Sequence, residues 1–500
     1  MKKIICYLLT ILLYPSYGFA QNQTDRTQIE QVINQYFEGW KYGDTTKLSA
    51  AMHSSCQLKN YNESEKRFVL FSRKDYLNIF RPREPHPQTR GRIVNMDITG
   101  YIAAAKIEII TAWGVFTDLF NLMRMEGRWY IVDKVSMYNP HPIVPVNPQK
   151  ETVMDGFKRP WSMVFLSENE VLISEKEGDL VKVNLTNKER IKIQGFPTDL
   201  EDSLSSFGDN TGKFEVLLHP NFKTNKFIYL SYAAKSAKGR TTKIIRAVLE
   251  NNALQQIKEL FVAEPFTYER VHYGGGMIFG NDGKLYFTIG ERIFTEKDEP
   301  ALPIAQNLAD KRGKIYRIND DGSIPNDNPD FGKNAVAGLY AVGIRAAQGL
   351  TIEPTTQKIW FSEHGTHQGD ELNVLKAGAN YGWPINTTGK YRFEAFKPPV
   401  IEGAKYTNPV WSWMQTVAPT GLMFYTGSEF PTWKNNLIVP GLSRGSLWRM
   451  TVDGENIVQA EELFANDRVR ARKVVQSPSG KLYLLTDEVN GKVIWIKNAR

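Results

Sequence analysis

Between residues 24 and 44, apolar side chains recur at steps of three and four, which is the spacing of one face of an α-helix. The segment reads TDRTQIEQVINQYFEGWKYGD, and its apolar positions are Ile29, Val32, Ile33, Tyr36, Phe37 and Trp40. Gly43 follows them, and glycine is common just past the end of a helix. The pattern predicts an amphipathic helix that ends at Gly43.

Beyond Asn95 the pattern changes to short runs of β-forming residues as far as Tyr138, with Glu126-Gly127 as a tight turn. Three or four strands fit this stretch. One or two helices followed by a curled antiparallel sheet predict a small α+β domain over residues 21–138. Residues 139–150 hold four prolines within ten positions, which predicts an extended, semi-rigid linker without helix.

From residue 151 to residue 500, a β run with a polar or glycine turn and a second β run recurs six times. Hairpins repeated at intervals of several tens of residues indicate a propeller or a solenoid, and long, irregular insertions favour a propeller whose loops carry function. We therefore predict a mainly β protein whose larger domain is a six-bladed β-propeller. The hairpins are 171–174 with 180–183, 227–232 with 243–248, 285–289 with 314–318, 359–362 with 372–375, 437–440 with 446–450, and 482–486 with 493–497.

Residues 1–20 have the features of a secretory signal peptide. Lys2 and Lys3 precede an apolar run from Ile4 to Tyr14, and small residues lie near position 20. The run is short of a full membrane span, and no second hydrophobic stretch of that length follows. We expect an exported protein, periplasmic or secreted, with no membrane insertion.

The 500 residues are 42% hydrophobic and 23% charged, a globular composition long enough for two or three domains. Removal of the signal lowers the formal charge from +8 to +6 and leaves Cys56 as the single cysteine, so no intrachain disulfide can form. Lys and Arg are scattered without a basic block. Nucleic acid is therefore not an expected partner, whereas a small anionic ligand is compatible.

The stretch EHGTHQGDELN, residues 363–373, brings Asp370 and Glu371 together after a glycine-rich turn, and NYGWP follows at residues 380–384. Calcium takes six to eight oxygen ligands from carboxylates, backbone carbonyls and water. The stretch fits a calcium site. On spacing alone, however, a polar loop between two strands is the favoured reading, because Asp, Glu and Gly are ordinary loop residues.

Two resemblances extend this reading. The segments HYGGGMIFGNDGKLYFTIGE, GKIYRINDDGSIPNDNP, EHGTHQGDELN with ANYGWP, and TVAPTGLMFY resemble the soluble glucose/sorbosone dehydrogenase family over about residues 155–499. Members similar to aldose sugar dehydrogenases are six-bladed propellers that use pyrroloquinoline quinone (PQQ) and calcium. Residues 25–140 resemble the SnoaL-like cone family, in its lumazine-binding-like branch, which includes enzymes, ligand binders and dimerisation modules. The fold itself assigns no function here: the cone domain could serve as a dimerisation module, which would make the protein a homodimer, or as a second binding site. For His53 and Asp118 in it, a structural reading stands ahead of a catalytic one.

The first resemblance implies roles for particular residues. His272 would be the base that takes the hydroxyl proton, and Arg345 would face the quinone. Arg470 and Arg472 would hold the carboxylates of PQQ, with Asn210 in place of a family glutamine. The implied calcium ligands fall into two groups, Gly365 and Thr366 for a cofactor ion, and Asp370, Glu371 and Tyr381 for a structural ion.

Several positions depart from the family pattern. Ala346 replaces an asparagine, Gly276 replaces an arginine, and Ser443, with Arg444 beside it, replaces a lysine. Two functions therefore remain open. One is a PQQ- and calcium-dependent dehydrogenase that oxidises the anomeric hydroxyl of an aldose to a lactone and passes electrons to an external acceptor. The other is a redox-inactive propeller that binds a sugar, glycan or protein partner.

Overall fold

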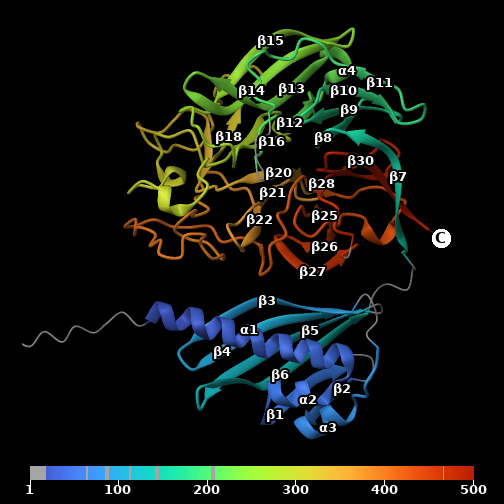
Figure 1. Ribbon diagram of the computed structural model, residues 1–500, viewed down its shortest axis with the longest axis vertical. Coiled ribbons are helices and arrows are strands. Elements are labelled where there is room, and N and C mark those ends of the chain that lie inside the picture. The colour runs from blue at the N-terminus through green and yellow to red at the C-terminus, as the bar shows by residue number, and fades with distance from the viewer. Residues whose placement is uncertain are drawn as a thin grey trace, which may run out of the picture. The chain divides into compact units, whose positions relative to one another are not determined.

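The computed structural model describes residues 18–499 apart from 63–65, 85–88, 112–113, 141–145, 204–208 and 466, and of residues 18–23 it describes the backbone only. The predicted signal peptide thus lies almost wholly outside the described residues. The chain divides into two compact units, Met1–Ile143 and Val144–Arg500 (Figure 1). No helix in the described part of the chain is long and apolar enough to cross a membrane.

The N-terminal unit packs helices against one face of a six-stranded sheet of order β2-β1-β6-β5-β4-β3. The predicted helix is α1, Gly18–Tyr42, which ends before Gly43, and its residues Ile29, Ile33 and Tyr36 are fully buried in the core. The other elements are α2 (Thr45–Ala51), β1 (Met52–Asn62), β2 (Arg67–Ser72), α3 (Arg73–Asn78), β3 (Arg90–Thr99), β4 (Ile102–Ile110), β5 (Gly114–Met125) and β6 (Arg128–Pro140).

This unit corrects one sequence expectation and confirms another. Strands β1 and β2 precede Asn95 and were not predicted, because their sequences alternate polar and apolar residues only weakly. β1 runs parallel to β6, so the sheet is mixed and not purely antiparallel. The turn at Glu126-Gly127 is confirmed between β5 and β6, and both residues have the positive φ that a tight hairpin turn requires.

The larger unit consists, within its described residues, of six four-stranded sheets, and each predicted hairpin forms the second and third strands of one sheet. The six-bladed propeller is confirmed. Its blades are β8–β11 (Pro160–Phe165, Glu170–Glu175, Leu180–Asn184, Arg190–Lys192), β12–β15 (Lys213–Leu218, Phe227–Ser236, Gly239–Glu250, Ala253–Val262), β16–β19 (Gly274–Phe279, Leu285–Ile289, Lys314–Ile318, Leu339–Val342), β20–β23 (Ala347–Ile352, Ile359–Glu363, Asp370–Val374, Trp411–Trp413), β24–β27 (Met423–Phe424, Leu437–Pro440, Leu447–Asp453, Asn456–Leu463) and β28–β30 (Ala471–Gln476, Leu482–Thr486, Gly491–Asn498) with β7. Between them lie α4 (Phe222–Asn225) and three 3₁₀ turns, η1 (Glu296–Asp298), η2 (Ile304–Gln306) and η3 (Pro431–Trp433).

The ring closes through a strand that the sequence did not reveal. The innermost strands contact one another in order from β8 to β24, β28 contacts β25 of the fifth blade, and β28 also contacts β8. The outer strand of the last blade is β7, Pro148–Phe157, which pairs antiparallel with β30. Pro148 is acceptable there because an edge strand can lack one N–H donor. The predicted linker is therefore shorter than expected, since residues 139–140 belong to β6 and 148–150 to β7, while 141–145 lie outside the described residues.

The antiparallel blades explain where the candidate residues lie. In each blade the start of the first strand is beside the end of the second, as the pairs Gly274 with Ile289 and Ala347 with Glu363 show. Residues just before a first strand and just after a second strand therefore meet at one rim of the propeller. His272, Arg345 and Arg470 all precede a first strand, so the fold brings them to the same rim.

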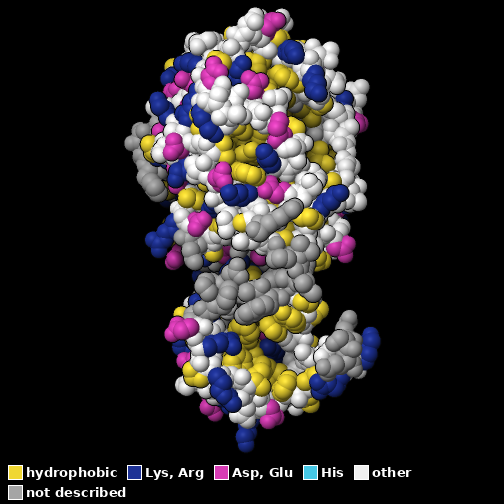
Figure 2. All heavy atoms as spheres, turned by 90° about the vertical axis from the view of Figure 1, so that its right-hand side faces the viewer, with side chains coloured by type: hydrophobic (Ala, Val, Ile, Leu, Met, Phe, Trp, Pro, Cys, Tyr) yellow, Lys and Arg dark blue, Asp and Glu magenta, His cyan; other side chains and the backbone are white. Residues whose placement is uncertain are grey.

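One face of the propeller carries charges of both signs. Figure 2 shows acidic and basic side chains interspersed on its visible face, without a continuous basic region.

Candidate active site

His272 lies two residues before the start of β16 and has a φ of 51°. This left-handed conformation costs a residue with a side chain about 1 to 3 kcal/mol and occurs often at functional sites. Its Nδ1 lies 3.0 Å from Oε1 of Glu291, and its Nε2 lies 3.2 Å from Nη2 of Arg345. Burial and the Arg345 charge lower the pKa of His272 well below its usual value. The imidazole is therefore neutral at pH 7 and able to accept a proton.

Glu291 was not singled out from the sequence, although it follows β17 and so lies across the blade from His272. Its side chain is buried, and the indole Nε1–H of Trp383 donates to its Oε2. The nearby carboxyl of Glu299 interacts electrostatically with it. Burial and this second carboxyl raise the pKa of Glu291 well above its usual range, despite the charge of Arg345 3.7 Å away. The signal that could have found it is its place in IGE, after the strand that pairs with β16.

Arg345 is held by residues of its own blade and reaches His272 of the preceding blade. Its Nη1 donates to the carbonyl of Gly365 at 2.5 Å and to that of His364 at 3.3 Å, and its backbone N–H donates to the Glu363 carboxyl. Its guanidinium lies 5.1 Å from the ring centre of Trp383. With 3% of the residue exposed, this cation is fixed in place beside His272.

A second group of cations surrounds one buried carboxylate, Asp487, which follows β29. Asp487 lies 2.8 Å from Nη2 of Arg472, 3.0 Å from Nζ of Lys176 and 3.4 Å from Nη2 of Arg470. These three charges outweigh its burial and hold the pKa of Asp487 well below its usual value. Three cations share one carboxylate, so the group carries an excess of two positive charges and is suited to an anionic ligand.

The two groups are joined by Gln348 and His364, which sequence reasoning also missed. Gln348, on β20 of the Arg345 blade, accepts a hydrogen bond of 2.5 Å from Nη1 of Arg472. Burial and the charges of Arg472 and Arg345 lower the pKa of His364 to about 3. In the described structure Nε2 of His364, Oγ1 of Thr366 and Nε of Arg472 are buried without a hydrogen-bond partner. Orphaned polar atoms beside excess positive charge fit a polar anion bound at this rim.

A small cavity of about 10 Å³ is lined by Arg345 and has room for one water-sized guest. Glu363 and Glu371 both line it, together with Gly365 and Tyr381. Burial and the neighbouring Glu371 raise the pKa of Glu363 to about 8, and burial raises that of Glu371 to about 7. Two buried carboxyls with raised pKa values at one cavity fit a cation. Among the described residues no three His, Cys, Asp or Glu side chains form a metal-binding group, so backbone carbonyls would have to complete the site.

Two predicted calcium ligands do not line this cavity. Oδ1 of Asp370 accepts the N–H of Gly365 at 2.8 Å, and its Oδ2 accepts those of Val417 and Ala418 at 2.6 and 2.7 Å. Asp370 thus fastens the loop before β22 to the next blade. Thr366 is buried beside it, and the Gly365 carbonyl is already occupied by Arg345.

Two predicted cofactor residues lie apart from these contacts. Arg444 pairs with Glu462 of its own blade at 3.3 Å, and 40% of its side chain is exposed. Asn210 precedes β12, and its backbone N–H donates to the carbonyl of Arg270 at 2.8 Å.

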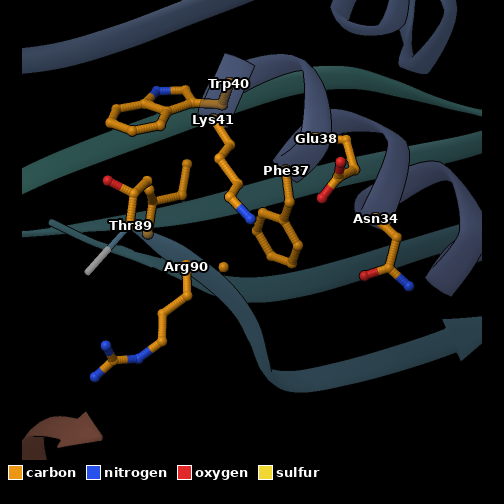
Figure 3. A pocket seen from close by; sticks show the side chains of 9 residues that line it. Asn34, Phe37, Glu38, Trp40, Lys41, Thr89 and Arg90 are labelled. Carbon is orange, nitrogen blue, oxygen red and sulfur yellow. The ribbon is translucent and has the colours of Figure 1, made fainter. Parts of the chain in front are cut away.

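The N-terminal unit has polar features of its own. Asp118 is fully buried in an ion pair of 2.8 Å with Lys134, whereas His53 lines a surface cavity. A further cavity of about 280 Å³ lies between α1 and β3. Figure 3 shows Lys41 and Phe37 side by side in it, with Arg90 pointing away from them. The side chains at this cavity are Asn34, Phe37, Glu38, Trp40, Lys41, Thr89, Arg90 and Ile109.

The chain is similar to several known sugar dehydrogenases. The aldose sugar dehydrogenase YliI of Escherichia coli (strain K12) is 30% identical over 358 residues, which cover 70% of this chain and 93% of that protein. Quinoprotein glucose dehydrogenase B of Acinetobacter calcoaceticus is 27% identical over 418 residues, 68% of this chain and 86% of that protein. The crystal structure of the apo form of the soluble aldose sugar dehydrogenase from Escherichia coli superposes with a TM-score of 0.64 at 27% identity, covering 71% of this chain and all of that one.

Family models match both units. A lumazine-binding model matches residues 24–137, in keeping with the predicted cone domain. The Glucose / Sorbosone dehydrogenase model matches residues 157–495, more than half of the chain. The contacts among His272, Glu291 and Arg345 lie within that match. This chain belongs to the glucose/sorbosone dehydrogenase family.

Proposed function

We propose that this protein is a PQQ- and calcium-dependent sugar dehydrogenase that oxidises the anomeric hydroxyl of an aldose to the lactone. The observation that carries the proposal is a neutral, buried His272 held between Glu291 and Arg345, next to a rim with excess positive charge. The named relatives are sugar dehydrogenases, and one is a quinoprotein.

His272 supplies the base. Oxidation of a sugar hydroxyl requires removal of the O–H proton as hydride leaves carbon. Glu291 fixes the imidazole through Nδ1, so Nε2 is the atom that accepts the proton. Arg345 beside Nε2 stabilises the negative charge that develops on the substrate oxygen, and because it is buried it needs no reorganisation to do so.

The cations of the rim would hold the cofactor. PQQ when bound supplies a two-electron acceptor, and its carboxylates suit the guanidinium groups of Arg470 and Arg472. Lys176 adds a third cation to the same group, and Gln348 sets the orientation of Arg472. The partly exposed Arg470 offers the most accessible charge, since its side chain is 43% exposed.

A calcium ion would be held by Glu363, Glu371 and carbonyls at the small cavity, including that of Tyr381. Calcium would remove the mutual repulsion of the two carboxylates, since a bound cation favours their ionised forms. In this assignment Glu363 joins the predicted ligands, and Asp370 holds the loop in place.

Reconstitution tests the function most directly. The purified protein is loaded with PQQ and calcium, and reduction of an artificial electron acceptor is measured with a panel of aldoses, alongside calorimetric titration of PQQ. We expect sugar-dependent reduction. If the loaded protein shows no sugar-dependent reduction and no binding of PQQ, the dehydrogenase proposal is rejected.

The alternative is a redox-inactive propeller that binds a sugar, glycan or protein. It is favoured by Ala346 and Ser443, which remove two polar groups expected to anchor the cofactor, and by the engagement of the Gly365 carbonyl with Arg345. Calorimetric binding of a sugar with no PQQ affinity would support it.

We extend the proposal to location and assembly. The signal-like residues 1–20 support export to the periplasm or beyond. On β5 and β6, Leu119 pairs with Val135 and Thr117 with Met137, and the three apolar side chains share one sheet face with 44 to 55% of each residue exposed. Such a face supports a homodimer, and sedimentation of the wild type against Leu119→Asp tests it.

A further inference from the structure

Two inserted loops meet at the rim that carries the candidate base. One covers residues 292–303 after β17, and the other covers residues 387–406 between β22 and β23. They are joined where the N–H of Phe393 donates to Oε2 of Glu296 at 3.0 Å. The two loops, which come from neighbouring blades, thus form one wall beside the site.

Each loop is also fastened to the site itself. The first begins next to Glu291, whose Oε1 lies 3.0 Å from Nδ1 of His272. The second is held through Trp383, whose indole N–H donates to Oε2 of the same carboxyl and whose ring centre lies 6.4 Å from that of Tyr391. Arg392 follows Tyr391 directly, so the loop carries its side chain on the side of the rim where the candidate base lies.

The guanidinium of Arg392 has few partners among the described residues. Its Nη1 donates to the carbonyl of Phe294 at 3.4 Å, and its central carbon lies 4.7 Å from the centre of the Phe294 ring. Glu296, the buried carboxyl at the junction of the loops, accepts the Phe393 N–H and forms no ion pair with Arg392. A guanidinium has five N–H donors in a planar fork, so most of them are available to a ligand.

The charge of Arg392 acts on the two residues that would handle the sugar hydroxyl. Burial, the charge of Arg345 and then that of Arg392 lower the pKa of His272. Burial and the charge of Arg392 also lower the pKa of Arg345, against the opposing effect of Glu291. A cation without a carboxylate partner attracts an anion, and its fork can bind a carboxylate or a phosphate through two parallel hydrogen bonds.

Exposed aromatic rings flank this cation. Phe294 is 50% exposed and Phe393 is 41% exposed, one on each loop. Aromatic surface with a few convergent polar groups is typical of small-molecule sites. The wall therefore offers apolar surface to a sugar ring and one guanidinium to a charged substituent.

We infer that the preferred substrate is an aldose with an anionic group away from its anomeric carbon, such as a uronate or a sugar phosphate, and that Arg392 binds this group. The inference rests on the proposed dehydrogenase function and narrows its substrate class. Arg392 holds the substrate and exchanges neither a proton nor an electron with it. A neutral aldose lacks this contact and is bound and oriented less well.

Substrate pairs that differ in charge test the inference. The wild type is reconstituted with PQQ and calcium, and kcat/KM is measured for glucuronate against glucose, galacturonate against galactose, and glucose 6-phosphate against glucose. In at least one pair kcat/KM should be about 10- to 100-fold higher for the acidic sugar, the range that a charge-assisted hydrogen bond contributes. Preference for the uronates identifies a carboxylate, and preference for the ester identifies a phosphate. Absence of preference in every pair overturns the inference.

Variants of Arg392 separate binding of the anion from support of the loop. The ratio of kcat/KM between acidic and neutral sugar should fall by about 10- to 100-fold in Arg392→Gln, whereas Arg392→Lys keeps the charge and should keep most of the preference. Lys397→Gln removes a cation from an exposed position of the same loop and should leave the ratio unchanged. If Arg392→Gln lowers kcat/KM for both sugars by the same factor, Arg392 only supports the loop and the inference is overturned.

Failure of the inference and failure of the proposed function are distinguishable. A wild type that oxidises neutral aldoses and prefers no acidic one rejects the inference alone. A wild type that is inactive with every aldose rejects the dehydrogenase, and calorimetric titration with sodium glucuronate and with glucose 6-phosphate then decides on the anion site. Binding that is at least about 10-fold weaker in Arg392→Gln supports the site. Equal binding by both proteins, or no binding by the wild type, overturns it.

Discussion

Replacement of Asp487 by asparagine removes the only carboxylate described in contact with three cations at the rim. At an effective dielectric constant of about 20, two unit charges about 3 Å apart attract by roughly 5 to 6 kcal/mol. Asp487 has two such contacts, to Lys176 and Arg472, both almost fully buried. Repulsion among the cations and lost hydration offset much of this attraction. The net cost of breaking a buried pair by removing one partner is about 3 to 5 kcal/mol, which is our expectation for Asp487→Asn.

Urea unfolding at pH 7 measures this cost, with the exposed Asp453→Asn as the control. The pKa of Asp487 is depressed in the folded state, so its stabilisation is complete above the unfolded value of about 4 and is lost as the pH falls below it. The difference between wild type and variant should therefore be constant from pH 5 to 7 and shrink towards pH 3. In the double variant with Lys176→Met the losses should not add, with a coupling of about 1 to 3 kcal/mol. A loss below about 1 kcal/mol, or strictly additive losses, would refute the reasoning.

Three further predictions follow from the two units. Calcium should raise the melting temperature of the protein, and Glu371→Gln should abolish that rise. The pKa values of Glu371 and Glu363 are about 7 and 8, so protons compete with calcium for these carboxylates. The calcium affinity measured by calorimetry should therefore increase from pH 6 to 9. His272→Ala should abolish sugar oxidation and leave PQQ affinity nearly unchanged in calorimetric titration; loss of both would mean a structural role. Lys134→Met should destabilise the N-terminal unit by about 3 to 5 kcal/mol, because it leaves the buried Asp118 carboxylate without its cation. Scanning calorimetry should show a lower transition temperature for the N-terminal unit and an unchanged one for the propeller. Equal shifts of both transitions would contradict independent units.

The blade hairpins could be read from the sequence because each is local and strongly apolar. The closing strand β7 could not, since its partner β30 is more than three hundred positions away and its own burial is slight. Likewise β1 pairs with β6 across most of the N-terminal unit. Local pattern identifies hairpins well and long-range edge pairing poorly.

The same limit applies to the candidate site. His272 and Arg345 could be found because motifs surround them. The same approach could not find Glu291, Gln348 and Asp487. Their local sequence does not indicate which buried cation or imidazole each side chain faces. Asp370 shows the opposite case, since its motif predicts a metal ligand while three backbone N–H groups occupy its oxygens.

The pairing of β7 with β30 has a consequence for how the chain is made. Residues 148–157 leave the ribosome before any blade exists, and their partner, Gly491–Asn498, is among the last segments to follow. The ring can therefore close only after synthesis of the propeller is nearly finished, and β7 has an unpaired edge until then. Unpaired strand edges promote association between chains. A chain whose last blade is incomplete therefore exposes the edge of β7 to neighbouring chains, and this exposure ends when β30 pairs with it.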